Sequence, residues 1–232
     1  MIAENLHRVR ATLKPGVRLV AVSKYHPVEA LQEAYDAGQR VFGESHVQEL
    51  VAKHDALPED IQWHFIGHLQ TNKVKYMAPF VSLIHSVDSA KLLKEINKQA
   101  RKANRVVDVL LQLHVAAEET KFGFSPDEVV EMLDGGEWKE LLNVRIVGLM
   151  AMATNTDDEG QIAGEFEQVR ALFERLKEHY FSDKAEFKDI SMGMSGDYLI
   201  AQEHGSTMVR VGSMIFGERD YSQPFHLSEV VK

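Results

Sequence analysis

A lysine stands at the end of an apolar run near the start of the sequence. Residues 19–22 read as a buried strand, Ser23 and Lys24 follow it, and Pro27 ends the extended segment. A lysine in this position loses hydration, and this lowers the pKa of its amine toward neutrality. A neutral amine can attack a carbonyl carbon and form an imine, or Schiff base. The sequence therefore predicts a carbonyl-binding role for Lys24. On its position alone, a structural ion pair between Lys24 and a neighbouring carboxylate is an equally good interpretation.

Hydroxyl-bearing and glycine residues stand at the ends of the last two predicted strands. Ser195 follows the seventh strand, and Gly212 and Ser213 follow the eighth, in which Arg210 adds positive charge. Eight-stranded α/β barrels commonly hold phosphate at these two ends, and glycine lets backbone approach a ligand closely. An amine opposite a phosphate cradle fits pyridoxal 5′-phosphate (PLP), which carries an aldehyde and a phosphate. Taken alone, Ser195 is more often a helix N-cap, and Arg210 could pair with a buried acid.

Strand-like and helix-like segments alternate along the whole chain. The predicted strands are residues 17–23, 40–42, 62–67, 80–87, 106–115, 144–150, 187–191 and 207–211. Alternation of this kind favours a parallel sheet, and the largely apolar strands fit a sheet that is covered on both faces. The count and the length predict an α/β fold with one domain, 1–232, built as a closed (β/α)8 TIM barrel with an extra N-terminal helix at about 2–13. An open doubly wound sheet is the alternative, although neither G-x-G-x-x-G nor G-x-x-x-x-G-K-[ST] is present.

Three capping-box patterns predict helix starts. They pair Ser125 with Glu128, Thr156 with Glu159, and Ser45 with Gln48.

The composition narrows the classes of function. The chain has 232 residues, of which 44% are hydrophobic and 26% charged, so it can bury a sizeable core. It contains no cysteine, which excludes disulfides and thiolate sites and is consistent with the cytoplasm. A formal net charge of -9 argues against non-specific nucleic-acid binding, and we interpret the basic run 98–105 as a solvated helix end.

Membrane and metal functions find little support in the sequence. The N-terminus lacks the apolar core of a signal peptide, and no apolar run reaches the length of a membrane span. His64 and His68 are four residues apart, a spacing that metal ligands can have, but they fall on a strand and its turn without the glutamate of an H-E-x-x-H motif. We therefore expect a cytoplasmic protein without a metal site.

Six segments resemble those of the PLP homeostasis protein family, called YggS in bacteria. In the order of the family, they are residues 20–24, 41–44, 63–73, 148–152, 191–197 and 205–213. The resemblance implies a barrel like the N-terminal domain of alanine racemases, which are fold-type-III PLP proteins. It also implies PLP as a Schiff base on Lys24, with its phosphate held by Ser195, Gly212 and Ser213.

The resemblance assigns three further residues to the cofactor site. The position of Arg210 faces the pyridine nitrogen in the racemase relatives, and Ser45 and Met150 lie in segments expected near the cofactor. The family usually has asparagine where this chain has Ser45, and often threonine where it has Ser213. Ser213 retains the hydroxyl of the family's threonine, whereas the side chain of Ser45 is shorter than that of the family's asparagine.

The same resemblance implies a carrier with no catalytic residues. Racemase relatives add a β-domain that supplies a tyrosine acid/base, and the segment after residue 211 is too short for one. An arginine at the ring nitrogen leaves that nitrogen unprotonated, so the ring is a poorer electron sink. We expect a monomer that binds PLP for intracellular PLP homeostasis and buffers it or delivers it to PLP-dependent apoenzymes.

Two enzyme hypotheses remain as alternatives. One is an amino-acid PLP enzyme such as a racemase, with Tyr25, His68 or Tyr198 as its acid/base. The other is an aldolase that uses Lys24 as a Schiff-base lysine without a cofactor.

Overall fold

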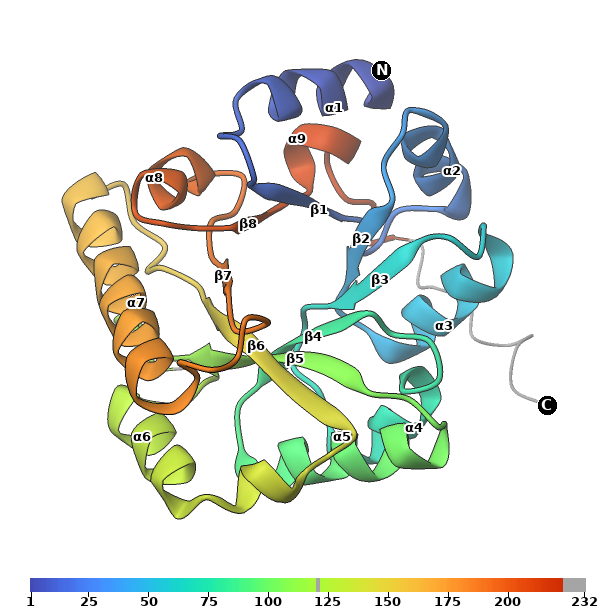
Figure 1. Cartoon of the computed structure of the whole chain (residues 1–232). Helices are drawn as coiled ribbons and strands as arrows, with labels where there is room; N and C mark the ends of the chain where they lie inside the picture. Colours follow the sequence, from blue (N-terminus) through green and yellow to red (C-terminus); the bar gives the residue numbers. More distant parts are fainter. Residues whose placement is uncertain (120–121, 223–232) are drawn as a thin grey trace.

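Eight parallel strands close into a barrel in the computed structural model, which describes residues 1–119 and 122–222 (Figure 1). The strands pair in chain order, and β1 pairs with β8 to close the ring. Their bounds are Arg18–Val22 (β1), Val41–Glu44 (β2), Gln62–Phe65 (β3), Leu83–Val87 (β4), Val107–Leu113 (β5), Val144–Ala151 (β6), Asp189–Ser191 (β7) and Met208–Val211 (β8). All eight predicted strands and the TIM barrel are thus confirmed, with ends that shift by a few residues. The predicted domain end at 232 lies outside the described residues.

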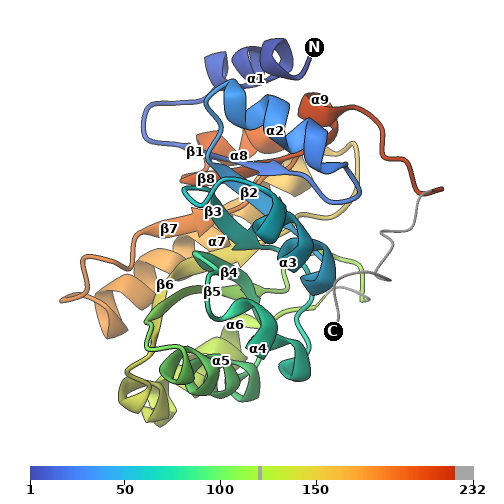
Figure 2. The same ribbon diagram turned by 90° about the vertical axis from the view of Figure 1, so that its right-hand side faces the viewer.

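Helices follow the strands and form the outer layer of the barrel. They are α1 (Ile2–Ala11), α2 (Val28–Asp36), α3 (Val47–Ala56), α4 (Val74–Met77), α5 (Ala90–Lys102), α6 (Pro126–Gly135), α7 (Glu159–Tyr180), α8 (Tyr198–Glu203) and α9 (Ser213–Phe216), with short 3₁₀ turns at Thr71–Lys73 and Glu137–Glu140. The extra N-terminal helix is confirmed as α1, which lies beside α2 and α9 on the outside of the barrel (Figure 1 and Figure 2). Within the described residues, no helix combines the length and the apolarity that crossing a membrane requires.

The capping boxes are confirmed in one case and wrong in two. Ser125 and Glu128 form the reciprocal box at the start of α6, with proline at the first helical position. Helix α7 is capped instead by Asp158, which stands directly before its first residue and accepts from the Gln161 N–H. Helix α3 begins one residue later than expected, so its N-cap is His46 and Ser45 lies outside the helix.

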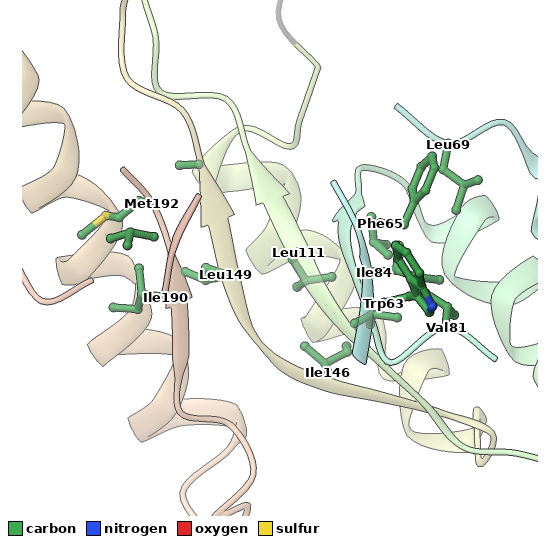
Figure 3. Close-up of a cluster of buried hydrophobic side chains, with 14 of the residues drawn as sticks. Trp63, Phe65, Leu69, Val81, Ile84, Leu111, Ile146, Leu149, Ile190 and Met192 are labelled. Carbon is green, nitrogen blue, oxygen red and sulfur yellow. The ribbon is translucent and has the colours of Figure 1, made fainter. Parts of the chain in front are cut away.

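Apolar side chains fill two separate layers. The larger layer lies between the strands and the helices: Trp63, Phe65 and Ile84 point to one side in Figure 3, and Ile190 and Met192 point to the other. The smaller layer lies inside the barrel and contains Val20, Leu83, Leu110, Val147, Met150 and Met208. This alternation of inward and outward residues is the period of two that a strand imposes.

Candidate functional site

Lys24 lies two residues beyond the end of β1, at an inward-facing position of the strand alternation. Its side chain is half-buried. Burial lowers the pKa of its amine, and the Arg219 charge lowers it further, whereas Tyr221, Glu44 and Glu49 act in the opposite direction. The direction of the pKa shift favours the neutral, nucleophilic form of the amine.

A buried ionic cluster lies directly behind this lysine, between β2 and α3. Lys53 Nζ donates to Glu44 Oε1 and to Glu49 Oε1 at 2.7 Å each, and all three side chains are at most 3% exposed. Ser23 Oγ donates to the same oxygen of Glu44 at 2.6 Å. Burial raises the pKa of Glu44 to about 7, and the Lys53 charge offsets part of that rise. The cluster therefore places two carboxyl groups against one ammonium group in a buried layer of the protein.

The cluster fixes the backbone on both sides of Lys24. Lys53 Nζ donates to the Ser23 carbonyl at 2.8 Å, and Glu49 Oε1 accepts from the Tyr25 N–H at 2.6 Å. Tyr25 has a φ of 65°, a left-handed conformation that is costly for a tyrosine. Such a conformation persists where surrounding contacts determine it, and here the contact is the Glu49 carboxylate.

The loops after β7 and β8 contact each other through Ser195 and Gly212. The Gly212 N–H donates to Ser195 Oγ at 3.4 Å. A Cβ on Gly212 would lie 2.9 Å from the Val22 carbonyl oxygen, so only glycine lets the β8 loop pass this close to the end of β1. Ser195 is not a helix N-cap, because α8 begins at Tyr198 and its N-cap is Asp197.

These two loops present unpaired backbone donors. The N–H groups of Ser195, Gly196, Ser213 and Met214 have no hydrogen-bond acceptor in the part of the chain that the structure describes. Two of them belong to the first turn of α9, where helix N–H groups are left without intrahelical partners. Four N–H groups and two serine hydroxyls thus lie on adjoining loops, and donors of this kind can bind an anion.

Arg210 is buried inside the barrel, 3% exposed, and donates to neutral oxygens. Its Nη1 donates to Ser191 Oγ at 2.6 Å and its Nη2 to the Ala151 carbonyl at 3.2 Å. Burial lowers its pKa to about 10, and the Asp197 charge acts in the opposite direction. Among the described residues no carboxylate lies within ion-pair distance of Arg210, so the alternative of a pair with a buried acid is not observed.

Two histidines continue the polar chain below Ser191. His85 Nδ1 lies 2.9 Å from Ser191 Oγ, and His85 Nε2 lies 2.8 Å from His64 Nδ1. Burial lowers the pKa of His64 to about 3 and that of His85 well below its ordinary value. His68 lies elsewhere, on the surface beside Asp88. Within the described residues, no group of three His, Cys, Asp or Glu side chains could hold a metal ion.

Ser45 and Met150 border the same end of the barrel. Ser45 is half-buried after β2, and its backbone lies so close to the next loop that a Cβ on Gly67 would be 2.4 Å from its carbonyl oxygen. Met150 belongs to β6 and to the interior layer, with Val20 and Met208. The backbone of Ser45 is thus held in place, while its short side chain has no hydrogen bond recorded within the described residues.

The predicted site residues come together on neighbouring strands. Lys24 follows β1, Ser195 follows β7, and Arg210, Gly212 and Ser213 lie on or after β8, which pairs with both. The roles of Lys53 and of the hydrogen-bonded chain through His64 and His85 were not predicted from the sequence. A Glu–Lys pair four residues apart on a helix is ordinarily solvent-exposed, so it gave no sign of burial. The histidines did carry a signal, since both interrupt apolar strands.

Comparisons with known proteins cover nearly the whole chain. Residues 1–220 match the family model described as "Alanine racemase, N-terminal domain". The chain is 42% identical over 205 residues to the pyridoxal phosphate homeostasis protein of Aquifex aeolicus, a match that spans 88% of each chain.

Solved structures show the same fold. The PipY protein of Synechococcus elongatus is 36% identical; the match covers 94% of this chain and 100% of PipY, with a TM-score of 0.88 without PLP and 0.84 with PLP bound. An alanine racemase from Clostridium difficile is 15% identical with a TM-score of 0.74, and the match covers 94% of this chain but 55% of the racemase. The likeness to the alanine racemase is one of fold alone.

Proposed function

The chain belongs to the pyridoxal phosphate homeostasis protein family, and from this premise we propose that it binds PLP at the carboxyl ends of its barrel strands and buffers or delivers the cofactor. The observation that carries the proposal is an amine and an anion cradle on adjoining strands. Lys24 follows β1, and the unpaired N–H groups follow β7 and β8. The PLP-bound structure of PipY supports the same ligand.

The phosphate end of PLP fits the paired loops after β7 and β8. Ser195 and Ser213 offer hydroxyls, and the N–H groups of Gly196 and Met214 have no acceptor in the described chain. Glycine at position 212 lets the β8 loop lie against the end of β1, since a Cβ there would meet the Val22 carbonyl oxygen at 2.9 Å. A dianionic phosphate would satisfy these donors through charge-assisted hydrogen bonds.

The aldehyde end fits Lys24. Its lowered amine pKa favours the neutral form, so Lys24 would hold the aldehyde end as the covalent anchor, with the aldehyde oxygen leaving as water. The buried cluster of Lys53, Glu44 and Glu49 holds the backbone on both sides of Lys24, so the side chain extends from a fixed main-chain position.

Arg210, Met150 and Ser45 would hold the ring of PLP at this end of the barrel. Arg210 can only donate hydrogen bonds, so it leaves the ring nitrogen as an acceptor. Met150, which belongs to the interior layer, would supply apolar contact to the ring, and Ser45, which follows β2, would border it. Bound PLP ordinarily supplies an electron sink for amino-acid chemistry, and an unprotonated ring nitrogen weakens that sink.

We propose that the protein carries PLP without catalysing a reaction. The surroundings of two candidate acid/base residues, Tyr198 and His68, support this. The Tyr198 hydroxyl lies 2.8 Å from Thr12 Oγ1, away from the barrel mouth. His68 is stacked on Phe122 with ring centroids 3.9 Å apart. The proposal extends to a monomer in the cytoplasm with PLP-dependent apoenzymes as recipients, which light scattering, cell fractionation and transfer to an apoenzyme would test.

The covalent anchor can be tested directly. After incubation with PLP, borohydride reduction and peptide mass mapping should find the adduct on Lys24. Lys24→Ala should lose the visible absorption of the covalent link, whereas Lys73→Ala, a lysine after β3 on the same rim, should keep it. An adduct confined to a lysine other than Lys24 contradicts the assignment.

Turnover is tested separately on the PLP-loaded protein. Exchange of the α-proton of each amino acid in deuterated water should stay far below the roughly 1–1000 per second of ordinary enzymes. Exchange at a few per second that disappears in Lys24→Ala would favour the racemase alternative instead.

A further inference from the structure

Arg210 is held by a hydrogen-bonded chain that crosses the interior of the barrel. The chain runs from Arg210 Nη1 to Ser191, then to His85 and His64, with distances of 2.6, 2.9 and 2.8 Å. Its last member lines a cavity of about 480 Å³ together with Arg18, Asp108, Arg145 and Asp189. Arg18 begins β1 and Asp189 begins β7, so this cavity lies at the end of the barrel opposite Lys24. The chain therefore connects the proposed ring site with the other end of the barrel.

The direction of every hydrogen bond in this chain follows from Arg210. A guanidinium only donates, so Ser191 Oγ accepts from it. The Ser191 proton then goes to His85 Nδ1, which makes His85 the Nε2–H tautomer and a donor to His64 Nδ1. If His85 Nδ1 donated to Ser191 instead, Ser191 Oγ would accept from both Arg210 and His85. The hydroxyl proton of Ser191 would then have no acceptor among the described residues.

The chain is neutral, and this decides its effect on Arg210. Burial lowers the pKa of both histidines, so both are uncharged near neutral pH. A carboxylate in contact with Arg210 would neutralise part of its charge, whereas the two groups that accept its hydrogen bonds are an uncharged hydroxyl and carbonyl, and the Asp197 charge acts on it without forming an ion pair. Because Ser191 also donates to His85, its oxygen becomes a stronger acceptor for the guanidinium.

We propose that Ser191, His85 and His64 act as positioning residues, forming a one-directional neutral relay that orients Arg210 and keeps its full charge directed at the ring nitrogen of bound PLP. This inference rests on the proposed function, because it takes the ring nitrogen to lie at Arg210. The relay itself exists without the cofactor and can be measured without it.

The tautomers are the first test and need no mutation. In ¹⁵N-labelled protein without PLP at pH 7, long-range ¹H–¹⁵N spectra should show His64 and His85 as neutral Nε2–H tautomers. An Nδ1–H tautomer or a doubly protonated ring at either residue overturns the relay. This measurement is unaffected by whether the protein binds PLP.

The second test follows the ring nitrogen in protein loaded with ring-¹⁵N-labelled PLP. Ser191→Ala and His85→Phe should each change the ¹⁵N shift of the ring nitrogen and weaken PLP binding about tenfold, the factor expected for one hydrogen bond to a charged group. His85→Gln should keep the shift and an affinity within about twofold of the original, because its amide can accept from Ser191 and donate to His64. His179→Gln, on the exposed face of α7, is the matched control.

The outcomes separate the two proposals. If His85→Phe folds, binds PLP and leaves the ring ¹⁵N shift unchanged, the relay is wrong while PLP binding stands. Failure of His85→Gln to restore the shift also counts against the relay. If the unmodified protein does not bind PLP, the proposed function fails, and the tautomers alone then decide whether the relay exists.

Discussion

Replacement of Lys53 by methionine should destabilise the protein strongly, because it leaves two buried carboxyl groups without their cation. Lys53 Nζ makes three hydrogen bonds of 2.7–2.8 Å, to Glu44, to Glu49 and to the Ser23 carbonyl. Methionine preserves most of the side-chain volume, so the change removes the charge and the donors with little loss of packing. Removing one partner of a buried ion pair costs about 3–5 kcal/mol. That is a large part of the roughly 5–15 kcal/mol that stabilises a typical protein.

The assay is equilibrium urea unfolding followed by tryptophan fluorescence, with Lys14→Met as the control. Lys14 also pairs with a glutamate, Glu203 at 2.8 Å, but its side chain is 46% exposed. The same substitution at this surface pair should cost less than about 1 kcal/mol. The contrast isolates burial, since the chemistry of the change is identical at both sites.

A second variant separates lost charge balance from lost packing. Lys53→Met combined with Glu44→Gln and Glu49→Gln removes the uncompensated charges and should recover part of the stability. PLP affinity should fall in the single variant, because Glu49 and Lys53 no longer fix the loop at Lys24. If Lys53→Met costs no more than Lys14→Met, the assignment of the cluster as an anchor is refuted.

The remaining predictions concern the phosphate end and the pH dependence of stability. Ser195→Ala should weaken PLP binding about ten- to hundredfold in a titration of the cofactor-free protein, and Ser45→Ala should weaken it less; equal effects would contradict the assignment. Below pH 6.5 the unfolded chain binds protons that buried His64 and His85 do not, so the free energy of unfolding should fall by about 1.4 kcal/mol per pH unit for each histidine. The raised pKa of Glu44 opposes this fall between about pH 4.5 and 7, so Glu44→Gln should lose more stability than the original protein between pH 7 and 5.5 in urea unfolding, and a smaller loss would contradict the reasoning.

The barrel could be predicted because its strands are buried on both faces. Parallel strands covered by helices read as apolar runs, and the helices between them have their own period and start signals. The start of α6 was predictable since Ser125 and Glu128 satisfy each other locally. Ser45 failed as a cap because the chain stays extended for one more residue, through His46.

The position of the candidate site residues at one rim of the barrel was also predictable, whereas the buried residues that hold them in place were not. Lys24, Ser195, Arg210 and Gly212 stand next to strand ends, and in a barrel all strand ends meet at one rim. Lys53 stands in the middle of a helix with a glutamate four residues before it, as a solvent-exposed pair would. Only the packing of α3 over β2 buries it, and that depends on contacts between distant segments.

The ionic cluster behind Lys24 and the neutral relay behind Arg210 have different consequences for the proposed carrier. The ionic cluster behind Lys24 makes the covalent anchor rigid, which favours formation of the bond to PLP by reducing the entropy lost on binding. In the proposed site, the neutral relay behind Arg210 would direct its positive charge at the ring nitrogen, which would disfavour protonation of that nitrogen and so weaken the ring as an electron sink. In this proposal the ionic cluster strengthens PLP binding, and the neutral relay suppresses the chemistry that bound PLP ordinarily supplies. A barrel built in this way would hold PLP firmly and leave it unused, which is what a protein that stores or hands over the cofactor requires.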